Sequence, residues 1–306
     1  MKKILLGLAG LVVLAVLGLA FYAVTFRPAQ RPAPAETVDR LPRRLARGQY
    51  LVTSVLDCFG CHSGRDWKRY AGPLSGPPGA GSEDCLTAEH GAPGRICFPN
   101  ITPDAEAGLG RWTDGEILRA LREGVDKDGK ALFPLMPYRE YRSLSDEDAR
   151  SVVAYLRILP AVRNTPPASR IDLPLSVFMK LAPQPLKAAV PVMDPTDRTV
   201  YGQYLATIAG CRFCHTPVDD RQQPIAGKEF AGGQVFRGPW GVVRSSNLTP
   251  HATGLGARTK ENFIALFKAY DNAESRDLPV KPEENTVMPW LGLSGMAEED
   301  MGAIYD

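Results

Sequence analysis

The motif Cys-x-x-Cys-His occurs twice in this chain, at residues 58–62 and again at residues 211–215. These two motifs hold four of the six cysteines in a sequence of 306 residues. The same tetrapeptide, Gly-Gln-Tyr-Leu, precedes each motif, at residues 48–51 and 202–205. A motif that returns together with its flanking sequence indicates an internal repeat, and a repeat constrains the fold more than composition does.

Three further landmarks follow each motif in the same order: an Asn-x-Thr-Pro step, a Gly-Leu-Gly step and a Met-Pro step before an aromatic residue. The motif histidine and the methionine of the last step are 74 residues apart from His62 to Met136. They are 73 residues apart from His215 to Met288. This nearly constant spacing predicts two copies of one structural unit, which we call the first and second repeat.

Proline and hydropathy divide the rest of the chain. Residues 4–26 form a run of 23 residues without a charge, and eight prolines fall between residues 159 and 199. Proline cannot continue a helix, so the second of these segments should be an ordered strap or a linker without a long helix. The predicted organisation is an N-terminal anchor at 1–27, a proline-rich linker at 28–42, the first repeat at 43–160, a proline-rich strap at 161–198 and the second repeat at 199–306.

Within the repeats the pattern is mostly helical. Thr113 followed by Glu116 fits a capping box, and Ser145 stands at a similar helix start. The expected helices cover 45–56, 113–121, 145–159, 262–270 and the residues from 298 onward. The last of these stops earlier than its counterpart in the first repeat, which is compatible with a chain that continues beyond Asp306. Few strands are expected.

Two thiols three positions apart, followed directly by a histidine, are the attachment signature of c-type haem. The thiols can form thioethers with the two vinyl groups of one haem, and the histidine then lies under the iron. A redox dithiol needs a βαβ context, and a zinc site needs two more ligands nearby; the sequence offers neither. The predicted attachment residues are Cys58, Cys61 and His62 in the first repeat and Cys211, Cys214 and His215 in the second.

The methionines at equivalent positions are candidates for the sixth iron ligand. Met136 and Met288 each stand in a Met-Pro step, and methionine paired with histidine is the usual ligand set of cytochromes c. A lone methionine more often fills a core, but the repeat favours the ligand interpretation here. The competing histidines, His90 and His251, lie on opposite sides of the Asn-x-Thr-Pro landmark and are expected to be loop residues.

The uncharged run at 4–26 is long enough to span a bilayer as a helix of about 20 residues. A cleavable signal peptide is the alternative, since Ala33-Pro34-Ala35 offers a cleavage site, although the apolar part of such a peptide usually has about 7–15 residues. We expect an uncleaved anchor, with residues 28–42 as a solvated spacer beyond it. The basic residues on both sides of the run leave its orientation undecided by charge.

Residues 100–129 and 131–156 look like the cytochrome c subunits of membrane-bound bacterial quinone-linked dehydrogenases for alcohols, aldehydes and sugar acids, and the resemblance covers both repeats, from about Arg47 to the end. Those subunits commonly carry three haems, whereas this chain has two motifs. The resemblance implies a mostly α fold with two tandem class I-like cytochrome c domains, and Met136 and Met288 as axial ligands. It also implies a haem pocket lined by Asn100, Thr102, Pro103, Trp112, Asn247, Thr249 and Pro250. The second repeat departs from this pattern, with Ala257-Arg258 where the first has Arg111-Trp112.

The two remaining cysteines, Cys85 and Cys97, lie in a glycine- and proline-rich insertion that the second repeat lacks. Haem attachment of this type takes place outside the bacterial cytoplasmic membrane, where disulfides form and persist. We expect a disulfide between them, the alternative being two buried free thiols. Closing a loop of this length stabilises a fold by roughly 3 kcal/mol in the chain-entropy model.

These features predict a membrane-anchored carrier of single electrons with two covalent haems c and no catalysis of its own. The near balance of 36 Lys and Arg against 34 Asp and Glu gives no reason to expect nucleic acid as a partner. The expected donor is a membrane dehydrogenase or a quinol-oxidising partner, and the expected acceptor is a soluble cytochrome, a copper protein or a terminal oxidase of the respiratory chain. A di-haem subunit of a cbb-type oxidase is the alternative; a di-haem peroxidase would need an iron position that can open.

The expected location follows from the chemistry of attachment. We expect a single pass through the bacterial inner membrane, with Lys2 and Lys3 on the inner side and the haem domains in the periplasm. The balanced charge provides no strong field to steer a distant partner, which favours a lasting complex over a diffusing shuttle.

Overall fold

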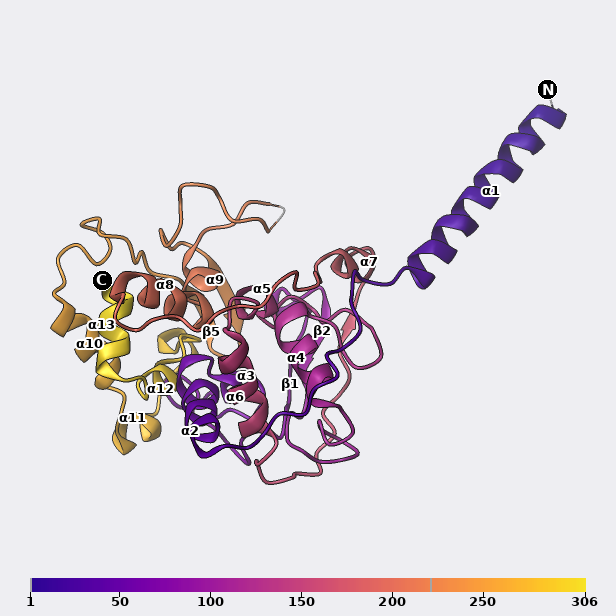
Figure 1. The fold of residues 1–306 in the computed structure, drawn as a ribbon. Helices are drawn as coiled ribbons and strands as arrows, with labels where there is room; N and C mark the ends of the chain where they lie inside the picture. The colour runs from indigo at the N-terminus through magenta and orange to yellow at the C-terminus, as the bar shows by residue number, and fades with distance from the viewer. Residues whose placement is uncertain (1, 221) are drawn as a thin grey trace.

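The computed structural model describes residues 2–220 and 222–306 of the chain. Helix α1 (Lys2–Thr25) projects away from the rest of the protein as a straight rod (Figure 1). Its segment Leu6–Ala23 is long and apolar enough to cross a membrane, and no side chain described in it is buried by the protein.

The helices of the two repeats follow one order. In the first repeat they are α2 (Pro42–Tyr50), the π-helix η1 (Leu51–Val55), α3 (Cys58–Cys61), α4 (Asp114–Glu123), α5 (Tyr138–Tyr141) and α6 (Asp146–Leu156). In the second they are α8 (Arg198–Ile208), α9 (Cys211–His215), α10 (Lys260–Lys268), α12 (Trp290–Leu293) and α13 (Glu298–Tyr305). The short helices α11 (Ala273–Asp277) and η4 (Pro282–Glu284) lie between α10 and α12.

Helix ends follow the local sequence signals. The hydroxyl of Thr113 accepts from the backbone N–H of Glu116, whose carboxylate accepts from the N–H of Thr113 in return, so the expected capping box is confirmed. Helix α6 begins after Ser145 as expected but ends at Leu156, three residues early. The N–H of Ile158 donates to the oxygen of Tyr155 at 3.0 Å, a tighter turn that closes the helix before Pro160.

The π-helix η1 absorbs a one-residue difference between the repeats. From Gly48 to His62 the chain advances 14 positions, but from Gly202 to His215 it advances only 13. In the second repeat, α8 runs as a regular α-helix over this stretch. One extra residue in a helix is accommodated as a π-turn, which keeps the residues on either side in phase. The insertion therefore leaves the attachment motif at the same place relative to the core.

A glycine marks the crossing of the first and last helices in each repeat. Helix α2 packs against α6, and α8 packs against α13. A methyl group at Gly48 would collide with the carbonyl oxygen of Ser151, and one at Gly202 would collide with that of Ala303. Both glycines are buried. Only the absence of a side chain allows the two backbones to approach this closely.

Short strands form between each Cys-x-x-Cys-His motif and its Asn-x-Thr-Pro step, and one more forms in the strap. Strands β1 (Ser82–Leu86), β2 (Gly94–Phe98) and β3 (Arg170–Ile171) make an antiparallel sheet in the order β1-β2-β3. The short helix η2 (Ala88–His90) joins the first two strands. Strands β4 (Val235–Gly238) and β5 (Gly241–Arg244) form a hairpin in the second repeat.

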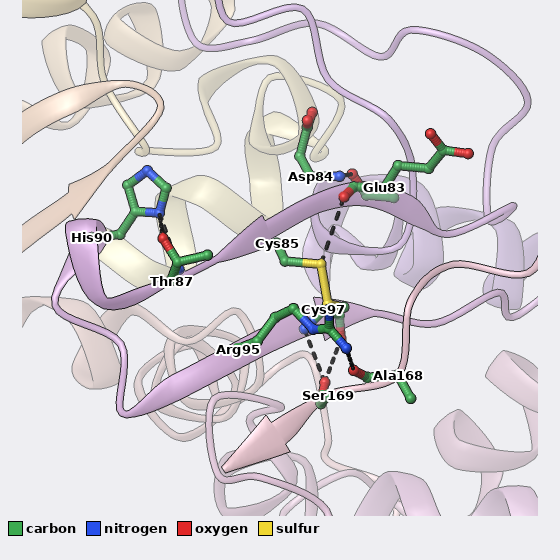
Figure 2. Close-up of a disulfide and its surroundings, with 10 residues drawn as sticks. Glu83, Asp84, Cys85, Thr87, His90, Arg95, Cys97, Ala168 and Ser169 are labelled. Carbon is green, nitrogen blue, oxygen red and sulfur yellow. Dashed lines mark hydrogen bonds between the residues drawn. A yellow bond between two sulfur atoms is a disulfide. The ribbon is translucent and has the colours of Figure 1, made fainter. Parts of the chain in front are cut away.

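The expected disulfide joins Cys85 on β1 to Cys97 on β2 (Figure 2). The Ser169 hydroxyl accepts from the N–H of Cys97 at 2.9 Å and donates to its oxygen at 3.1 Å, so the sheet is also attached to the strap. His90 belongs to this insertion, where its Nδ1 accepts from the N–H of Thr87 at 3.1 Å.

The segment 28–42 is not the solvated spacer that its prolines suggested. Arg31 pairs with the buried carboxylate of Glu123 at 2.8 Å, and the N–H of Val38 donates to Asp114 at 2.8 Å. Val38 itself is buried in the core. The prolines keep this segment extended, and its side chains and backbone groups find partners along the surface of the first repeat.

The strap also lies on the first repeat. The Nδ2 group of Asn164 donates to the oxygen of Ala80 at 2.9 Å, and the N–H of Asp146 donates to the oxygen of Val190 at 2.9 Å. Only short helical turns interrupt it, α7 (Leu175–Phe178) and η3 (Met179–Leu181). Its many prolines leave few backbone donors, and side-chain amides and hydroxyls of the first repeat provide much of its hydrogen bonding.

The two repeats contact each other reciprocally. Helix α5 of the first packs against α8 of the second, and α12 of the second packs against η1 of the first. The Tyr50 hydroxyl donates to Asp300 at 2.6 Å, and the Tyr204 hydroxyl donates to Asp148 at 2.6 Å. Each hydroxyl also accepts a backbone N–H from the start of the partner's last helix, from Ala297 and from Ser145 respectively. One hydrophobic core runs across this interface.

The glycine crossings give the first prediction, in which close helix packing decides whether a Gly→Ala change raises or lowers stability. Gly48→Ala and Gly202→Ala should destabilise the protein by about 1–3 kcal/mol, because the new methyl group has no space. In an unpacked helix the same change would stabilise by about 1 kcal/mol. Thermal unfolding followed by circular dichroism measures the difference. Gln49→Ala and Gln203→Ala, at the exposed neighbouring positions, are the matched controls; a stabilising Gly→Ala change would contradict the close crossing.

The reciprocal hydroxyls give a second prediction. Tyr204→Phe should lower stability by about 1.5–3 kcal/mol, because a hydrogen bond to a charged, buried carboxylate is lost. Tyr50→Phe should cost less, since Tyr50 is the more exposed of the two. Tyr138→Phe is the control: its buried hydroxyl has no hydrogen-bond partner within the described residues, so its removal should not destabilise. Equal melting temperatures for all three variants would refute the assigned role of the interface.

Candidate haem attachment sites

Each Cys-x-x-Cys-His motif forms a single helical turn that starts from a left-handed residue. Asp57, with φ 43°, precedes α3, and Gly210, with φ 72°, precedes α9. Residues three apart on such a turn lie on one face, so both thiols of a motif face the same way. Gly210 adopts this conformation without steric cost, while Asp57 does so as one of the few non-glycine residues that tolerate it.

Both motif histidines are oriented by the same kind of bond. His62 Nδ1 lies 2.7 Å from the oxygen of Pro99, and His215 Nδ1 lies 2.8 Å from the oxygen of Ser246. A carbonyl oxygen can only accept, so Nδ1 carries the proton and Nε2 keeps its lone pair. Burial lowers the pKa of both histidines, which favours the neutral form. A neutral imidazole with its second nitrogen held by a carbonyl is the arrangement that metal-ligating histidines use, so both residues fit haem iron.

The four motif thiols are unbridged, in contrast to the Cys85–Cys97 pair. Burial raises the pKa of Cys61 and Cys211 to about 11 and that of Cys214 to about 12. Burial therefore favours the neutral thiol form of these cysteines. Among residues 2–220 and 222–306, no group of three or more His, Cys, Asp or Glu side chains forms a metal-binding cluster.

The Asn-x-Thr-Pro loops are built identically. The Asn100 side-chain oxygen accepts from the N–H of Thr102 at 2.8 Å and from its hydroxyl at 2.7 Å. Asn247 makes the same two bonds with Thr249 at the same distances. The first loop is more deeply buried, because Asn100 also donates to two strap oxygens at 2.7 and 2.9 Å. These loops follow directly after Pro99 and Ser246, so they hold the carbonyls that orient the motif histidines.

The two candidate methionines lie in matching turns. The N–H of Tyr138 donates to the oxygen of Met136, and that of Trp290 donates to the oxygen of Met288, both at 2.8 Å. Both methionines are half-buried and pack against the core. The residues before them differ: the N–H of Met136 donates to the oxygen of Phe133, while that of Met288 donates to the hydroxyl of Thr286.

Trp112 of the first repeat and Arg258 of the second occupy the same backbone position. The N–H of Trp112 donates to the oxygen of Leu109, and the N–H of Arg258 donates to the oxygen of Leu255 in the same turn. Trp112 packs against the core. The backbone position is therefore shared, but an indole ring is present only in the first repeat.

Arg65 is a site residue that the sequence did not reveal. Its guanidinium donates to the oxygens of Gly60 and Ala71 at 2.6 and 2.5 Å and to that of Gly72, and it lies over the ring of Trp67. These bonds attach the first motif to the following loop. The second repeat has Val218 at this position, so the repeat offers no signal from which the role of Arg65 could be read.

The two motifs lie near each other at the interface between the repeats. Burial raises the pKa of Cys214, and nearby Cys211 and Cys61 raise it further, so a thiol of the first motif lies within electrostatic range of the second motif. Glu140 on α5 also contributes to this shift and lies near Arg212 of the second motif. The reciprocal contacts of α5 and α12 thus bring the two candidate attachment sites together.

The paired motifs, each with an oriented histidine and a matching methionine loop, define a c-type cytochrome. The chain is 32% identical over 242 residues to the alcohol dehydrogenase (quinone) cytochrome c subunit of Gluconobacter oxydans, covering 74% of this chain and 46% of that protein. It is 33% identical over 238 residues to the gluconate 2-dehydrogenase cytochrome c subunit of Pantoea cypripedii, covering 73% and 50%. It is 27% identical over 248 residues to a diheme cytochrome c-type protein of Cereibacter sphaeroides, covering 79% and 78%. No protein-family model matches the chain.

The chain is therefore a homologue of the cytochrome c subunits of quinone-linked dehydrogenases, which confirms the resemblance seen in the sequence. This homology implies that it binds haem c. The chain spans about half the length of the dehydrogenase subunits it matches.

The number of haems bound per chain gives the third prediction. The purified protein should contain two haems per chain that resist extraction into acidic organic solvent, because each motif supplies two thiols for thioether bonds. Replacing Cys58 and Cys61 by Ala should remove one haem, and replacing Cys211 and Cys214 by Ala should remove the other. Absorbance of the reduced pyridine complex per polypeptide measures the count. A loss of both haems from either folded variant, or extractable haem in the unaltered chain, would contradict two independent attachment sites.

Proposed function

We propose that this protein is a membrane-anchored, periplasmic di-haem cytochrome c with two tandem class I-like cytochrome c domains, residues 43–160 and 199–306. It passes single electrons from a dehydrogenase or quinol-oxidising partner to a downstream acceptor of the respiratory chain. The observation that carries this proposal is the matched pair of Nδ1–carbonyl bonds, His62 to Pro99 and His215 to Ser246. These bonds prepare both imidazoles to bind iron in the same way.

The residues of each repeat have complementary roles in this proposal. Cys58 and Cys61 hold one group covalently, and Cys211 and Cys214 hold the other. When bound, haem c supplies an iron centre that changes its charge by one electron. His62 with Met136, and His215 with Met288, would fill the two axial positions. Filling both positions with side chains leaves no place for a substrate, which favours electron transfer over a peroxidase activity.

The interface between the repeats supports transfer between the two sites. Electron transfer slows steeply with distance, so two sites that exchange electrons benefit from a fixed, short separation. Tyr50 on α2 and Tyr204 on α8 each bond to the last helix of the other repeat, and α2 and α8 are the helices that lead into the two motifs. The single core across the interface adds apolar burial to these bonds. The repeats should therefore move as one body.

The apolar helix α1 supports attachment to a membrane. The linker from Arg31 to Val38 is bonded to the first repeat, so this repeat would be held near the bilayer. The relatives are named as subunits of fructose, alcohol and gluconate dehydrogenases, which supports a dehydrogenase as the donor. A soluble cytochrome, a copper protein or a terminal oxidase is the proposed acceptor.

Extraction under gentle conditions provides the fourth prediction and tests the partnership. Native gels of detergent-solubilised membranes, stained for haem, should show the chain migrating with a dehydrogenase subunit that mass spectrometry identifies. Co-migration with terminal oxidase subunits would favour the oxidase alternative, and a lone chain would indicate a free-standing carrier.

Protease treatment of intact spheroplasts should remove the haem domains from outside. If they survive until the membrane is breached, the periplasmic location is wrong.

A further inference from the structure

The strap exposes a compact apolar surface at its helical turns. Leu173, Phe178 and Leu181 are 78%, 59% and 64% exposed. Leu175 is exposed as well. Leu175, Phe178 and Leu181 recur every third residue on α7 and η3, a spacing that places them on one side of a helical turn. Four large apolar side chains within nine residues expose a patch of apolar surface to water, which is unfavourable.

This surface lies beside the end of the membrane helix. Lys180, within the same turns, donates from Nζ to the oxygen of Ala23 at 2.7 Å, and Ala23 is the last residue of the apolar stretch of α1. Figure 1 shows α7 next to the point where the chain leaves α1. The final carbonyls of a helix lack partners within the helix and carry partial negative charge, so an ammonium group bound there is favourable.

The surroundings mark the level of a membrane surface. The rings of Tyr22 and Phe26 lie tilted against each other at the end of the apolar stretch, with centroids 5.2 Å apart; aromatic residues are enriched where a helix leaves the bilayer. Between residues 170 and 187 the strap carries three basic side chains and one acidic side chain. An apolar turn flanked by basic residues is the composition of segments that lie in a lipid interface.

We propose that residues 173–181 form a second membrane contact, in which Leu173, Leu175, Phe178 and Leu181 enter the outer part of the bilayer next to α1. This inference rests on the proposed membrane span of α1. With two contacts, the first repeat cannot rotate freely about the linker. The strap, bonded to both α1 and the first repeat, fixes the orientation of the haem domains relative to the membrane plane.

Photo-crosslinking of the full chain tests this contact. The photoreactive residue p-benzoylphenylalanine replaces Phe178, Leu14 within α1, or Val242 on β5, which is 65% exposed and serves as the matched control. The protein is reconstituted in vesicles of phosphatidylethanolamine and phosphatidylglycerol, irradiated and digested, and lipid adducts are counted by mass spectrometry. We expect adducts at 14 and 178, several-fold above those at 242.

The possible outcomes distinguish the membrane contact of residues 173–181 from the membrane span of α1. Adducts at 14 with only the control level at 178 would overturn the second contact and leave the span intact. Adducts to protein instead of lipid at 178 would also overturn it, and would assign the surface to a partner. Adducts at 178 but not at 14 would refute the span, and with it a contact that lies beside a spanning α1. Control-level adducts at both positions would overturn both.

A second, independent observation concerns the methionine loop of the second repeat. Asn285 is 6% exposed, and its side chain is bonded almost entirely to the first repeat. Its Oδ1 accepts from the N–H of Ala71 at 2.9 Å, and its Nδ2 donates to the oxygens of Trp67 and Arg69 at 2.9 and 3.2 Å. Arg65 binds the same loop and links it to the first attachment motif.

The bonds continue from Asn285 to Met288. Its Oδ1 also accepts from the N–H of Thr286 at 2.8 Å, and the Thr286 hydroxyl accepts from the N–H of Met288 at 3.0 Å. In the first repeat the corresponding residue is Phe133, which has no side-chain amide, and its own backbone oxygen accepts from the N–H of Met136. The first methionine loop is thus closed locally, and the second is held from the other repeat.

We infer that Asn285 is a positioning residue for Met288, so that methionine ligation in the second repeat depends on docking to the first. This inference rests on Met136 and Met288 as axial ligands. Loss of the amide should let the loop move and weaken the bond to sulfur. A weaker thioether ligand lowers the reduction potential of that haem.

The test uses the Met136→Ala background, in which the remaining long-wavelength charge-transfer band of oxidised, methionine-ligated haem reports the second site alone. Asn285→Ala in this background should reduce the band and lower the higher of the two measured potentials. Gln203→Ala, at an exposed position, should leave both unchanged. If Met136→Ala with Met288→Ala retains the band, the ligand assignment is wrong. If that pair abolishes the band but Asn285→Ala leaves band and potential unchanged, only the positioning role is refuted.

Discussion

The arrangement of the whole protein depends on the reciprocal bonds between its repeats. Tyr50 and Tyr204 come from the helices that lead into the two attachment motifs, and their partners Asp300 and Asp148 come from the last helices of the opposite repeats. Each bond therefore links the start of one repeat to the end of the other. Tyr204 and Asp148 are buried, so losing one of them leaves the polar group of the other buried and unsatisfied. The distance between the attachment sites is set by these contacts.

A nearly symmetric repeat has acquired asymmetric additions, and most of them lie on the first copy. The π-helix, the Cys85–Cys97 disulfide and the Arg65 network have no equivalent among the described residues of the second copy. The linker and the strap also cover the first copy, and the second binds one of its loops through Asn285. The two sites therefore share one design but have different surroundings. In the proposed function, these surroundings would give two haems of the same kind different potentials.

The additions also make the two ends of the molecule different. Helix α1 and the turn α7 lie at one end, and the helices of the second repeat lie toward the other (Figure 1). The linker and the bond from Lys180 to Ala23 both join the membrane helix to the first repeat and its strap. In the proposed function, this places the first site nearer to the bilayer and leaves the second repeat more accessible to a partner in solution.

The repeat, the Cys-x-x-Cys-His motifs, most helices and the cysteine pair could be read from the sequence alone, because each of these depends on residues close together in the chain or on matched spacing. The Thr113 capping box and the Cys-x-x-Cys-His turns are local features of this kind. Tertiary structure decided what no local pattern encodes. Residues 28–42 read as a spacer, since proline indicates extended backbone but not what that backbone contacts. Arg65 and Asn285 looked like ordinary polar residues, because their partners are backbone groups of loops that only the folded chain brings together. Gly48 and Gly202 stood in a repeated tetrapeptide, but the reason for glycine there is a helix crossing about 100 residues away in sequence.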